Sequence, residues 1–162
     1  MKITIDTNII RADEFDKLLS ECKSKGWDVA VVSVTGREPG GTDWDIKFEP
    51  LLKMPETLVL DESCLNEAIL GNKNSQDDLQ EILEIISSGS YPKTGNNLSE
   101  GFRRQLRDAM IFQAHLREDR DVFVTNDEHD FIRDGRREKL QNKFDTKILT
   151  KDEFSAFLLN SP

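Results

Sequence analysis

The chain has 162 residues, of which 22 are Lys or Arg and 31 are Asp or Glu, so its formal net charge at pH 7 is −9. This length suits one domain with a core of ordinary size, and we expect a single domain over residues 1–162. No apolar run approaches the roughly 20 residues of a membrane span, the first residues lack the features of a targeting segment, and the acidic balance argues against non-specific binding of nucleic acid through net charge.

The N-terminal part of the chain predicts two strands separated by a helix. Residues 2–6 alternate and are rich in β-branched side chains, as in a short strand. Apolar residues within 15–22 recur at the spacing of one helical face, and Gly26 ends that helix. Residues 28–35 form a nearly continuous apolar run, typical of a strand buried on both faces of a parallel sheet. Residues 36–45 hold three glycines and a proline, which predicts a loop.

The rest of the chain continues this alternation of strands and helices. We expect a strand over residues 57–63, a short helix over 66–70, and a helix that begins near Ser75 and ends at Gly89. The remaining expected elements are a long helix over residues 100–118 capped by Ser99, strands over 121–125 and 147–150, and a last helix begun by a Thr150–Glu153 capping box.

Strands that alternate with helices predict right-handed crossovers, and therefore an α/β fold whose parallel sheet is covered on both faces. In such folds ligands bind beyond the carboxyl ends of the strands. Polar and acidic residues follow three of the predicted strands, namely Asp6, Thr7 and Asn8, then Asp61 and Glu62, and then residues 126–130. We therefore expect a functional site at this edge of the sheet.

The long helix adds Asp108, which shares one helical face with Ile111, Phe112 and His115. A carboxylate among such side chains needs a partner, because burying it unpaired is costly. Two partners are open: the cation of Arg104 one turn earlier, or a bound metal ion. Several carboxylates in one cleft would repel each other strongly without a cation, and hard oxygen ligands select Mg²⁺ or Mn²⁺ over Zn²⁺.

Two motifs match the pattern of a known family. The first strand runs into Asp6-Thr7-Asn8, and residues 107–131 place Asp108 on a helix, followed by a hydrophobic strand and then Thr-x-Asp-x-x-Asp-Phe over residues 125–131. The chain thereby resembles the PIN-domain family of small metal-dependent ribonucleases, which includes the toxins of many bacterial toxin–antitoxin pairs. The resemblance implies a three-layer α/β/α sandwich with a central, mainly parallel twisted sheet.

The resemblance also implies a catalytic set of acidic residues that hold Mg²⁺ or Mn²⁺ and hydrolyse RNA phosphodiester bonds through an activated water. The implied set is Asp6, Glu67, Asp108 and Asp127, with Asp130 nearby as a further metal ligand. Asn8 and Thr125 are implied as hydrogen-bonding residues that orient these carboxylates.

The second acid of this set has two candidates, because the family places a Glu on the helix that follows an early strand. Glu67 lies within an expected helix, whereas Glu38 lies at the more usual distance from Asp6 but beside a proline and two glycines. We favour Glu67. On this assignment residues 28–48 contain an additional strand and loop.

The resemblance implies an RNA substrate and leaves open an antitoxin protein and a homodimer. From the two cysteines, the short apolar runs and the first residues we expect a cytoplasmic location and no membrane partner. The alternative is a PIN-like module that binds RNA or protein without catalysis. A phosphotransferase of the haloacid-dehalogenase type is disfavoured, because Asn8 stands where that chemistry needs a second Asp. Cys22 and Cys64 are too few for a disulfide framework, and we expect both to be buried. Two basic clusters could contact phosphate: Arg103, Arg104 and Arg107, and then Arg133, Arg136, Arg137 and Lys139.

Overall fold

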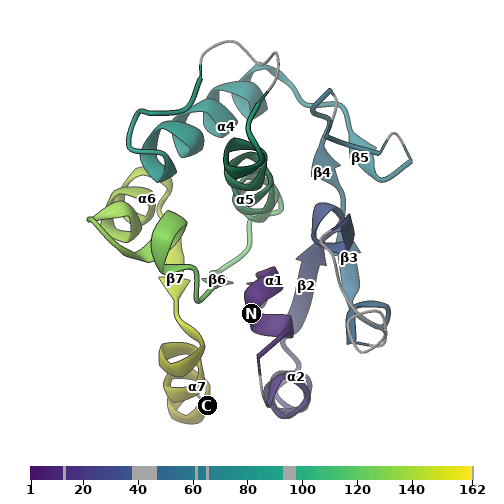
Figure 1. The fold of residues 1–162 in the computed structure, drawn as a ribbon. Helices are drawn as coiled ribbons and strands as arrows, with labels where there is room; N and C mark the ends of the chain where they lie inside the picture. Colours follow the sequence, from purple (N-terminus) through teal and green to yellow (C-terminus); the bar gives the residue numbers. More distant parts are fainter. Residues whose placement is uncertain (13, 38–46, 61, 65, 93–97, 162) are drawn as a thin grey trace.

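The computed structural model describes residues 1–12, 14–37, 47–60, 62–64, 66–92 and 98–161. Its centre is a sheet of five strands in the order β3-β2-β1-β6-β7 (Figure 1). Every neighbouring pair is parallel, so the carboxyl ends of all five strands lie at the same edge. The predicted α/β fold with a parallel sheet is confirmed. The strands are β1 (Lys2–Ile5), β2 (Asp28–Val32), β3 (Leu52–Met54), β6 (Val122–Val124) and β7 (Lys147–Leu149).

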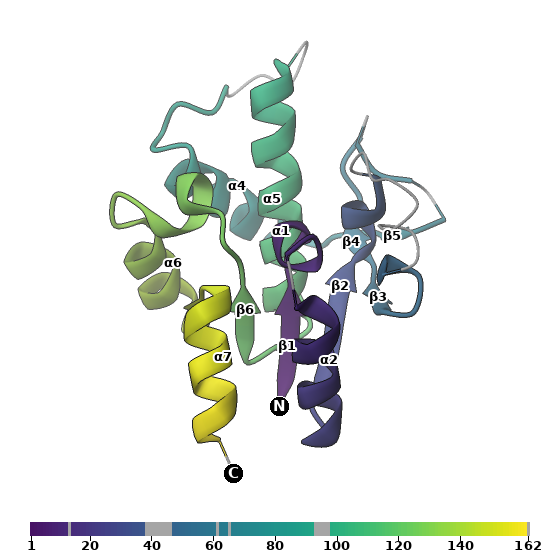
Figure 2. The same ribbon diagram turned by 60° about the horizontal axis from the view of Figure 1, so that its bottom comes forward.

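Each face of the sheet carries its own hydrophobic cluster, because successive side chains of a strand point to opposite faces. Ile3 and Ile5 of β1 belong to one cluster, and Val32 and Phe123 of the neighbouring strands belong to the other. The first cluster includes residues of α1 (Thr7–Ile10), α2 (Phe15–Ser24) and α7 (Lys151–Asn160). The second includes residues of α4 (Lys73–Ile86), α5 (Glu100–Arg117) and α6 (Arg136–Phe144). In Figure 2, α2 and α7 lie in front of the strands, and α4 and α5 lie behind them.

The helices α2, α4, α5 and α7 occupy the stretches where apolar periodicity predicted them. Gly26 follows α2 with a φ of +68°, a left-handed conformation that glycine adopts at little cost. Ser99 accepts a hydrogen bond from the Phe102 amide at the start of α5, and Thr150 and Glu153 form the expected capping box. Within the described ranges, no helix has the length and apolar character that crossing a membrane requires.

The stretch 28–48 was expected as an additional strand and loop. Its strand, β2, lies inside the central sheet between β1 and β3. β2 ends at Val32, earlier than expected, and a 3₁₀ turn η1 (Ser33–Arg37) follows it. Most of the predicted loop, from residue 38 to residue 45, lies outside the described residues.

The largest departure from the predicted elements lies between residues 56 and 70. The strand expected over 57–63 is reduced to β4 (Glu56–Thr57), and a strand, β5 (Ala68–Ile69), takes the place of the helix expected over 66–70. β4 and β5 pair in parallel and form a separate two-stranded sheet. The apolar run that suggested a buried strand turns toward solvent, since Leu60 is 83% exposed. Cys64 is also exposed, contrary to expectation, whereas Cys22 is buried.

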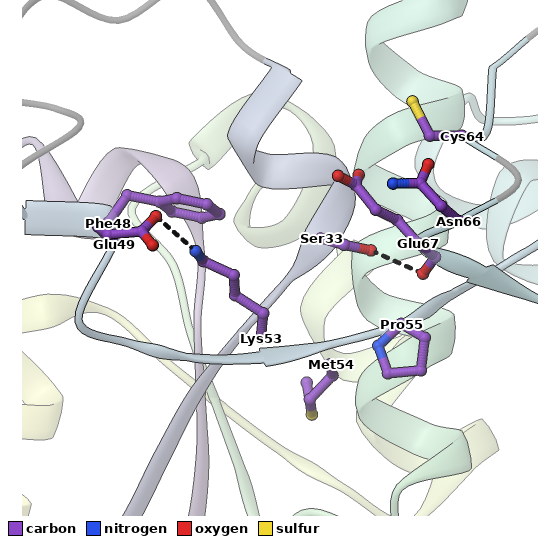
Figure 3. A pocket seen from close by; sticks show the side chains of 9 residues that line it. All are labelled: Ser33, Phe48, Glu49, Lys53, Met54, Pro55, Cys64, Asn66 and Glu67. Carbon is purple, nitrogen blue, oxygen red and sulfur yellow. Dashed lines mark hydrogen bonds and ion pairs between the residues drawn. The ribbon is translucent and has the colours of Figure 1, made fainter.

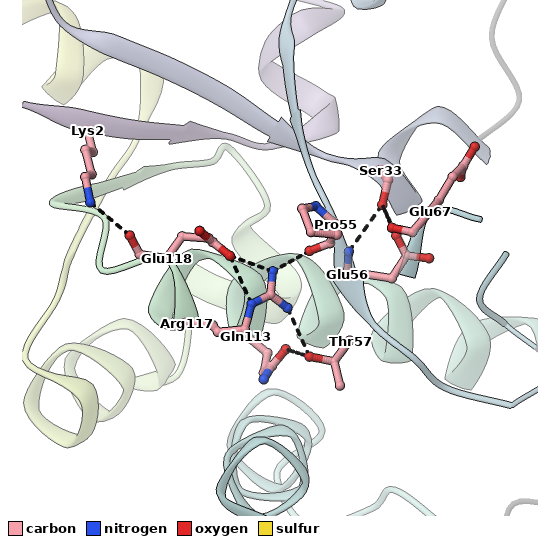
Figure 4. Close-up of polar contacts among 9 residues, drawn as sticks. All are labelled: Lys2, Ser33, Pro55, Glu56, Thr57, Glu67, Gln113, Arg117 and Glu118. Carbon is pink, nitrogen blue, oxygen red and sulfur yellow. Dashed lines mark hydrogen bonds and ion pairs between the residues drawn. The ribbon is translucent and has the colours of Figure 1, made fainter. Parts of the chain in front are cut away.

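Polar side chains of α5 form hydrogen bonds with β4 and with the residue before it (Figure 4). Arg117 donates from Nη1 to Thr57 Oγ1 at 3.1 Å and from Nη2 to the carbonyl oxygen of Pro55. Thr57 then donates to Gln113 Oε1 at 2.6 Å, and both of these side chains are buried. The segment around β4 is therefore held against the C-terminal half of α5.

Candidate functional site

Asp6 lies where β1 ends and α1 begins, at the carboxyl edge of the sheet. Its carboxylate accepts hydrogen bonds from the Thr7 amide at 2.7 Å, from Asn8 Nδ2 at 2.7 Å and from Thr125 Oγ1 at 2.6 Å. Its exposed fraction is 2%. Three donors thus fix the orientation of a carboxylate that is almost entirely buried.

Asn8 and Thr125 connect Asp6 to the segment that follows β6. Thr125 Oγ1 accepts from Asn8 Nδ2 at 3.1 Å and from the Asp127 amide at 3.0 Å. Asn8 Oδ1 accepts from the amide of Asn126 at 2.8 Å. Both residues therefore hold Asp6 and the Asp127 segment together, as the orienting role proposed for them requires.

Asp127 and Asp130 lie at the start of a π-helical turn, η2 (Glu128–Ile132). Asp127 caps this turn, since its Oδ1 accepts from the Asp130 amide at 2.9 Å. Asp130 is buried, and its Oδ1 accepts from Gln105 Nε2 at 3.0 Å and lies 2.7 Å from His129 Nδ1. The side chain of Phe131 is fully buried and anchors the turn in the core.

Asp108 on α5 completes the cluster. Carboxylate oxygens of Asp108, Asp127 and Asp130 lie within 4.8 Å of one another. Burial raises the pKa of Asp108 well above its ordinary value, and the charges of Asp6, Asp127 and Asp130, together with a hydrogen bond to Asp130, raise it further. Arg104 is paired with Glu100. Arg104, one of the two partners considered for Asp108, therefore forms its ion pair with a different acid.

The acids Asp6, Asp108 and Asp127 line one pocket of about 470 Å³. Three arginines also line it: Arg11, Arg104 and Arg107. The pocket therefore combines carboxylates with cations beside them, a combination that suits a metal ion and an anionic substrate together.

Two of the side chains that shape this site, Gln105 and Arg11, were not predicted. A third, Glu62, was expected only as an acidic residue after a strand, and its partners were not predicted. Gln105 lies one turn before Asp108 on the same helix, and that spacing could have indicated it. Arg11 follows α1 without any distinguishing pattern. Glu62 is buried and forms ion pairs with Arg103 and with Arg107, the latter with 3.0 Å from Nε to Oε2. The pairing of Glu62 with two arginines of α5 depends on packing between segments far apart in the chain, and the residues next to Glu62 in the sequence do not indicate it.

Glu67 does not reach this pocket, which corrects its expected place in the acidic set. The helix that was to carry it does not form, and Glu67 instead precedes β5 and lines a second pocket (Figure 3). Glu38, the alternative, lies outside the described residues. The structure thus brings together Asp6, Asp108, Asp127 and Asp130 and leaves out Glu67.

Several other candidate residues have local partners. In the second basic cluster, Arg133 pairs with Glu128, Arg136 with Asp134, and Arg137 with Glu153. His115 is buried far along α5 between two threonine hydroxyls, away from the acidic pocket.

The donor atoms of the acidic cluster fit a hard divalent cation. They are carboxylate oxygens, the ligand type that Mg²⁺ and Mn²⁺ prefer. Burial is the main cause of the raised pKa of Asp108, and the charges of Asp6, Asp127 and Asp130 add to it. A bound cation would offset both effects. Compared with known proteins, the chain matches no family model, no curated protein and no solved structure.

Proposed function

We propose that this protein is a Mg²⁺- or Mn²⁺-dependent ribonuclease with a PIN-like three-layer fold, which hydrolyses phosphodiester bonds of RNA. The observation that carries the proposal is the convergence of four aspartates from three separate parts of the chain. Oxygens of Asp108, Asp127 and Asp130 approach within 4.8 Å of one another, and Asp6 lines the same pocket as Asp108 and Asp127.

The cost of this arrangement favours a bound cation. Two carboxylates about 4 Å apart repel by roughly 4 kcal/mol at an effective dielectric constant near 20. Proteins are stable by only about 5–15 kcal/mol, so several such pairs are a large burden for a purely structural cluster. A divalent cation would turn this repulsion into attraction.

In this proposal Asp6, Asp108, Asp127 and Asp130 hold the metal ion. When bound, the ion supplies an activated water and neutralises charge on the phosphate. Asn8 and Thr125 keep the carboxylate of Asp6 in one orientation through their hydrogen bonds. Arg11, Arg104 and Arg107 line the same pocket and can contact phosphate oxygens. An antitoxin that occupies this pocket is compatible with the proposal.

The experiment compares the wild-type protein with Asp108→Asn, using Asp77→Asn on the exposed side of α4 as the matched control. At Mn²⁺ concentrations of 100 times the dissociation constant, we expect the wild type to gain about 2.7 kcal/mol of stability. Asp108→Asn should lose this gain and should no longer cleave a labelled single-stranded RNA. Without metal it should be more stable than the wild type, because a carboxyl group whose charged form is disfavoured by burial and by the neighbouring acids is gone.

Two results would contradict the proposal. If millimolar Mg²⁺ and Mn²⁺ leave the melting temperature unchanged and the RNA stays intact, the protein is a binding module rather than a nuclease. If Asp108→Asn destabilises the metal-free protein, Asp108 has a structural role and the assignment of the site is wrong.

A further inference from the structure

A second pocket of about 510 Å³ lies at the same edge of the sheet as the acidic pocket. We infer that it binds one base of the RNA strand and prefers a base with an exocyclic amino group to uracil. This inference rests on the proposed ribonuclease function and adds a specificity site to it.

The position of the pocket is the first argument. It is lined by Ser33, which directly follows β2, and by Met54 and Pro55 at the end of β3. The acidic pocket lies at the ends of β1 and β6. Since β3, β2, β1 and β6 are successive neighbours and strands lie about 4.8 Å apart, the two sites are separated by roughly 10 Å along one edge. A few nucleotides of a single strand can span that distance.

The chemistry of the lining is the second argument. Figure 3 shows Phe48 and Lys53 on one side of the pocket and Asn66 and Glu67 on the other. Phe48 and the buried Met54 form the apolar part of the lining, and Lys53 Nζ lies over the Phe48 ring, 4.9 Å from its centroid. This apolar wall is suited to contact with the flat face of a base. Asn66 offers an amide that both donates and accepts, and Glu67 offers a carboxylate that accepts. An apolar wall opposite paired hydrogen-bonding groups is suited to reading the edge of an unstacked base.

The charge of the lining decides between base and phosphate. Among the residues that the structure describes, the lining has two carboxylates, Glu49 and Glu67, and one ammonium group, Lys53, whose Nζ is 2.8 Å from Glu49 Oε2. The pairing of Lys53 with Glu49 disfavours a phosphate group here, whereas three arginines line the first pocket. A carboxylate accepts well from the amino group of cytosine. When it approaches the single ring N–H of uracil, it meets a carbonyl oxygen on each side.

The turn that carries Asn66 and Glu67 lies against Ser33 and the buried Glu56. Ser33 Oγ lies 3.4 Å from the carbonyl oxygen of Glu67 and accepts a hydrogen bond from the Glu56 amide at 3.2 Å. It also donates to the carboxylate of Glu56, which is fully buried (Figure 4). The turn that presents Asn66 and Glu67 is therefore tied to the end of β2, which reduces the ordering cost of binding.

The test measures binding of fluorescein-labelled oligocytidine and oligouridine RNA of equal length, by fluorescence anisotropy in EDTA so that no cleavage occurs. We expect the wild type to bind oligocytidine at least about fivefold more tightly than oligouridine. Glu67→Gln and Asn66→Ala should each bring the two affinities within about twofold. Glu84→Gln makes the same change of charge as Glu67→Gln, but on the exposed side of α4. This variant should keep the preference for oligocytidine.

Equal affinities of the wild type for the two oligomers, or a preference that persists in both Glu67→Gln and Asn66→Ala, would overturn the inference. Both altered side chains are exposed, and unchanged melting temperatures confirm that the variants are folded. The cleavage assay with Mn²⁺ is read separately. A protein that cleaves RNA without this preference retains the proposed function and loses only the base site.

Discussion

Thr125 is the residue on which the geometry of the acidic pocket depends most directly. Its hydroxyl group donates to Asp6 and accepts from the Asp127 amide and from Asn8. It is fully buried, so water cannot replace these partners. One small side chain thereby links the carboxylate of Asp6 to the Asp127 segment.

Thr125→Val should destabilise the protein by about 1–3 kcal/mol, because it removes a buried hydroxyl group and leaves its partners unsatisfied. It should also weaken Mn²⁺ binding, since Asp6 loses one of its donors. Urea denaturation and titration with Mn²⁺ measure the two effects.

Thr35→Val is the matched control. Thr35 is fully buried, and its hydroxyl group has no hydrogen-bond partner among the residues that the structure describes. Replacing an unsatisfied buried hydroxyl by a methyl group is neutral or stabilising. An equal loss of stability in both variants would mean that the Thr125 network contributes nothing beyond its volume.

At the scale of elements, apolar periodicity was sufficient for the helices that cover the sheet. The short helix α1 was not predicted, and the second exception is α6. Its nine residues contain Leu140 and Phe144 but also four basic side chains, so no apolar stripe indicates it. The strands β1, β2, β6 and β7 were recognisable as short runs rich in apolar side chains. β3 was not predicted, because its three residues include Lys53 and an exposed Leu52.

The segment from β4 to β5 could not be predicted in the same way. The apolar run Leu58-Val59-Leu60 predicted a buried strand. The strand that forms, β4, pairs over only two residues with the equally short β5. What holds β4 in place is a set of contacts to Arg117 and Gln113, about 60 residues away in the chain. The placement of Glu67 depends on this packing, so the acidic set from Asp6, Asp108 and Asp127 was predictable and the location of Glu67 was not.

Arg117→Met should loosen the β4–β5 pair while leaving the central sheet intact. The variant keeps the aliphatic stem and loses the hydrogen bonds to Thr57 and Pro55, which should cost about 1–3 kcal/mol. Hydrogen exchange should accelerate at the Leu58 amide, which donates to the Ile69 carbonyl at 2.8 Å, but not at residues of β1.

Arg137→Met serves as the control for this prediction. Arg137 pairs with the half-exposed Glu153, and such surface pairs contribute about 0–1 kcal/mol. Uniform acceleration of exchange across both sheets in Arg117→Met would show that β4 and β5 unfold only with the whole protein, contrary to the anchoring described above.

For the whole molecule, the parallel sheet explains why the two pockets lie side by side. Parallel strands place all their carboxyl ends at one edge, and every acidic, aromatic or basic side chain that follows a strand is delivered there. A chain with a net charge of −9 can thereby keep arginines beside its acidic pocket. The sum of the charges says little about binding, whereas their distribution along this edge fits both a cation and a nucleic-acid strand.

A histidine of α5 that packs against the same sheet links the stability of the whole molecule to pH. His115 lies between Thr4 of β1 and Thr146 just before β7, with Nδ1 2.9 Å from Thr4 Oγ1 and Nε2 2.7 Å from Thr146 Oγ1. Burial lowers the pKa of His115 from 6.5 to about 3, and the nearby Arg120 contributes to this shift. The folded protein therefore keeps this imidazole neutral at pH values where the unfolded chain protonates it.

Between about pH 6.5 and pH 3 the unfolded state binds one more proton than the folded state at this residue, so stability falls as the pH falls. From pH 7 to pH 5 the loss from His115 should be about 2 kcal/mol. Urea denaturation of the wild type and of His115→Gln at both pH values isolates it, because every other titrating group is common to the two proteins. His115→Gln should be less stable at pH 7, since it loses ring contacts with Phe112 and Phe123, but its stability should depend less steeply on pH. Parallel pH profiles for the two proteins would show that the buried imidazole is not the source of the acid sensitivity.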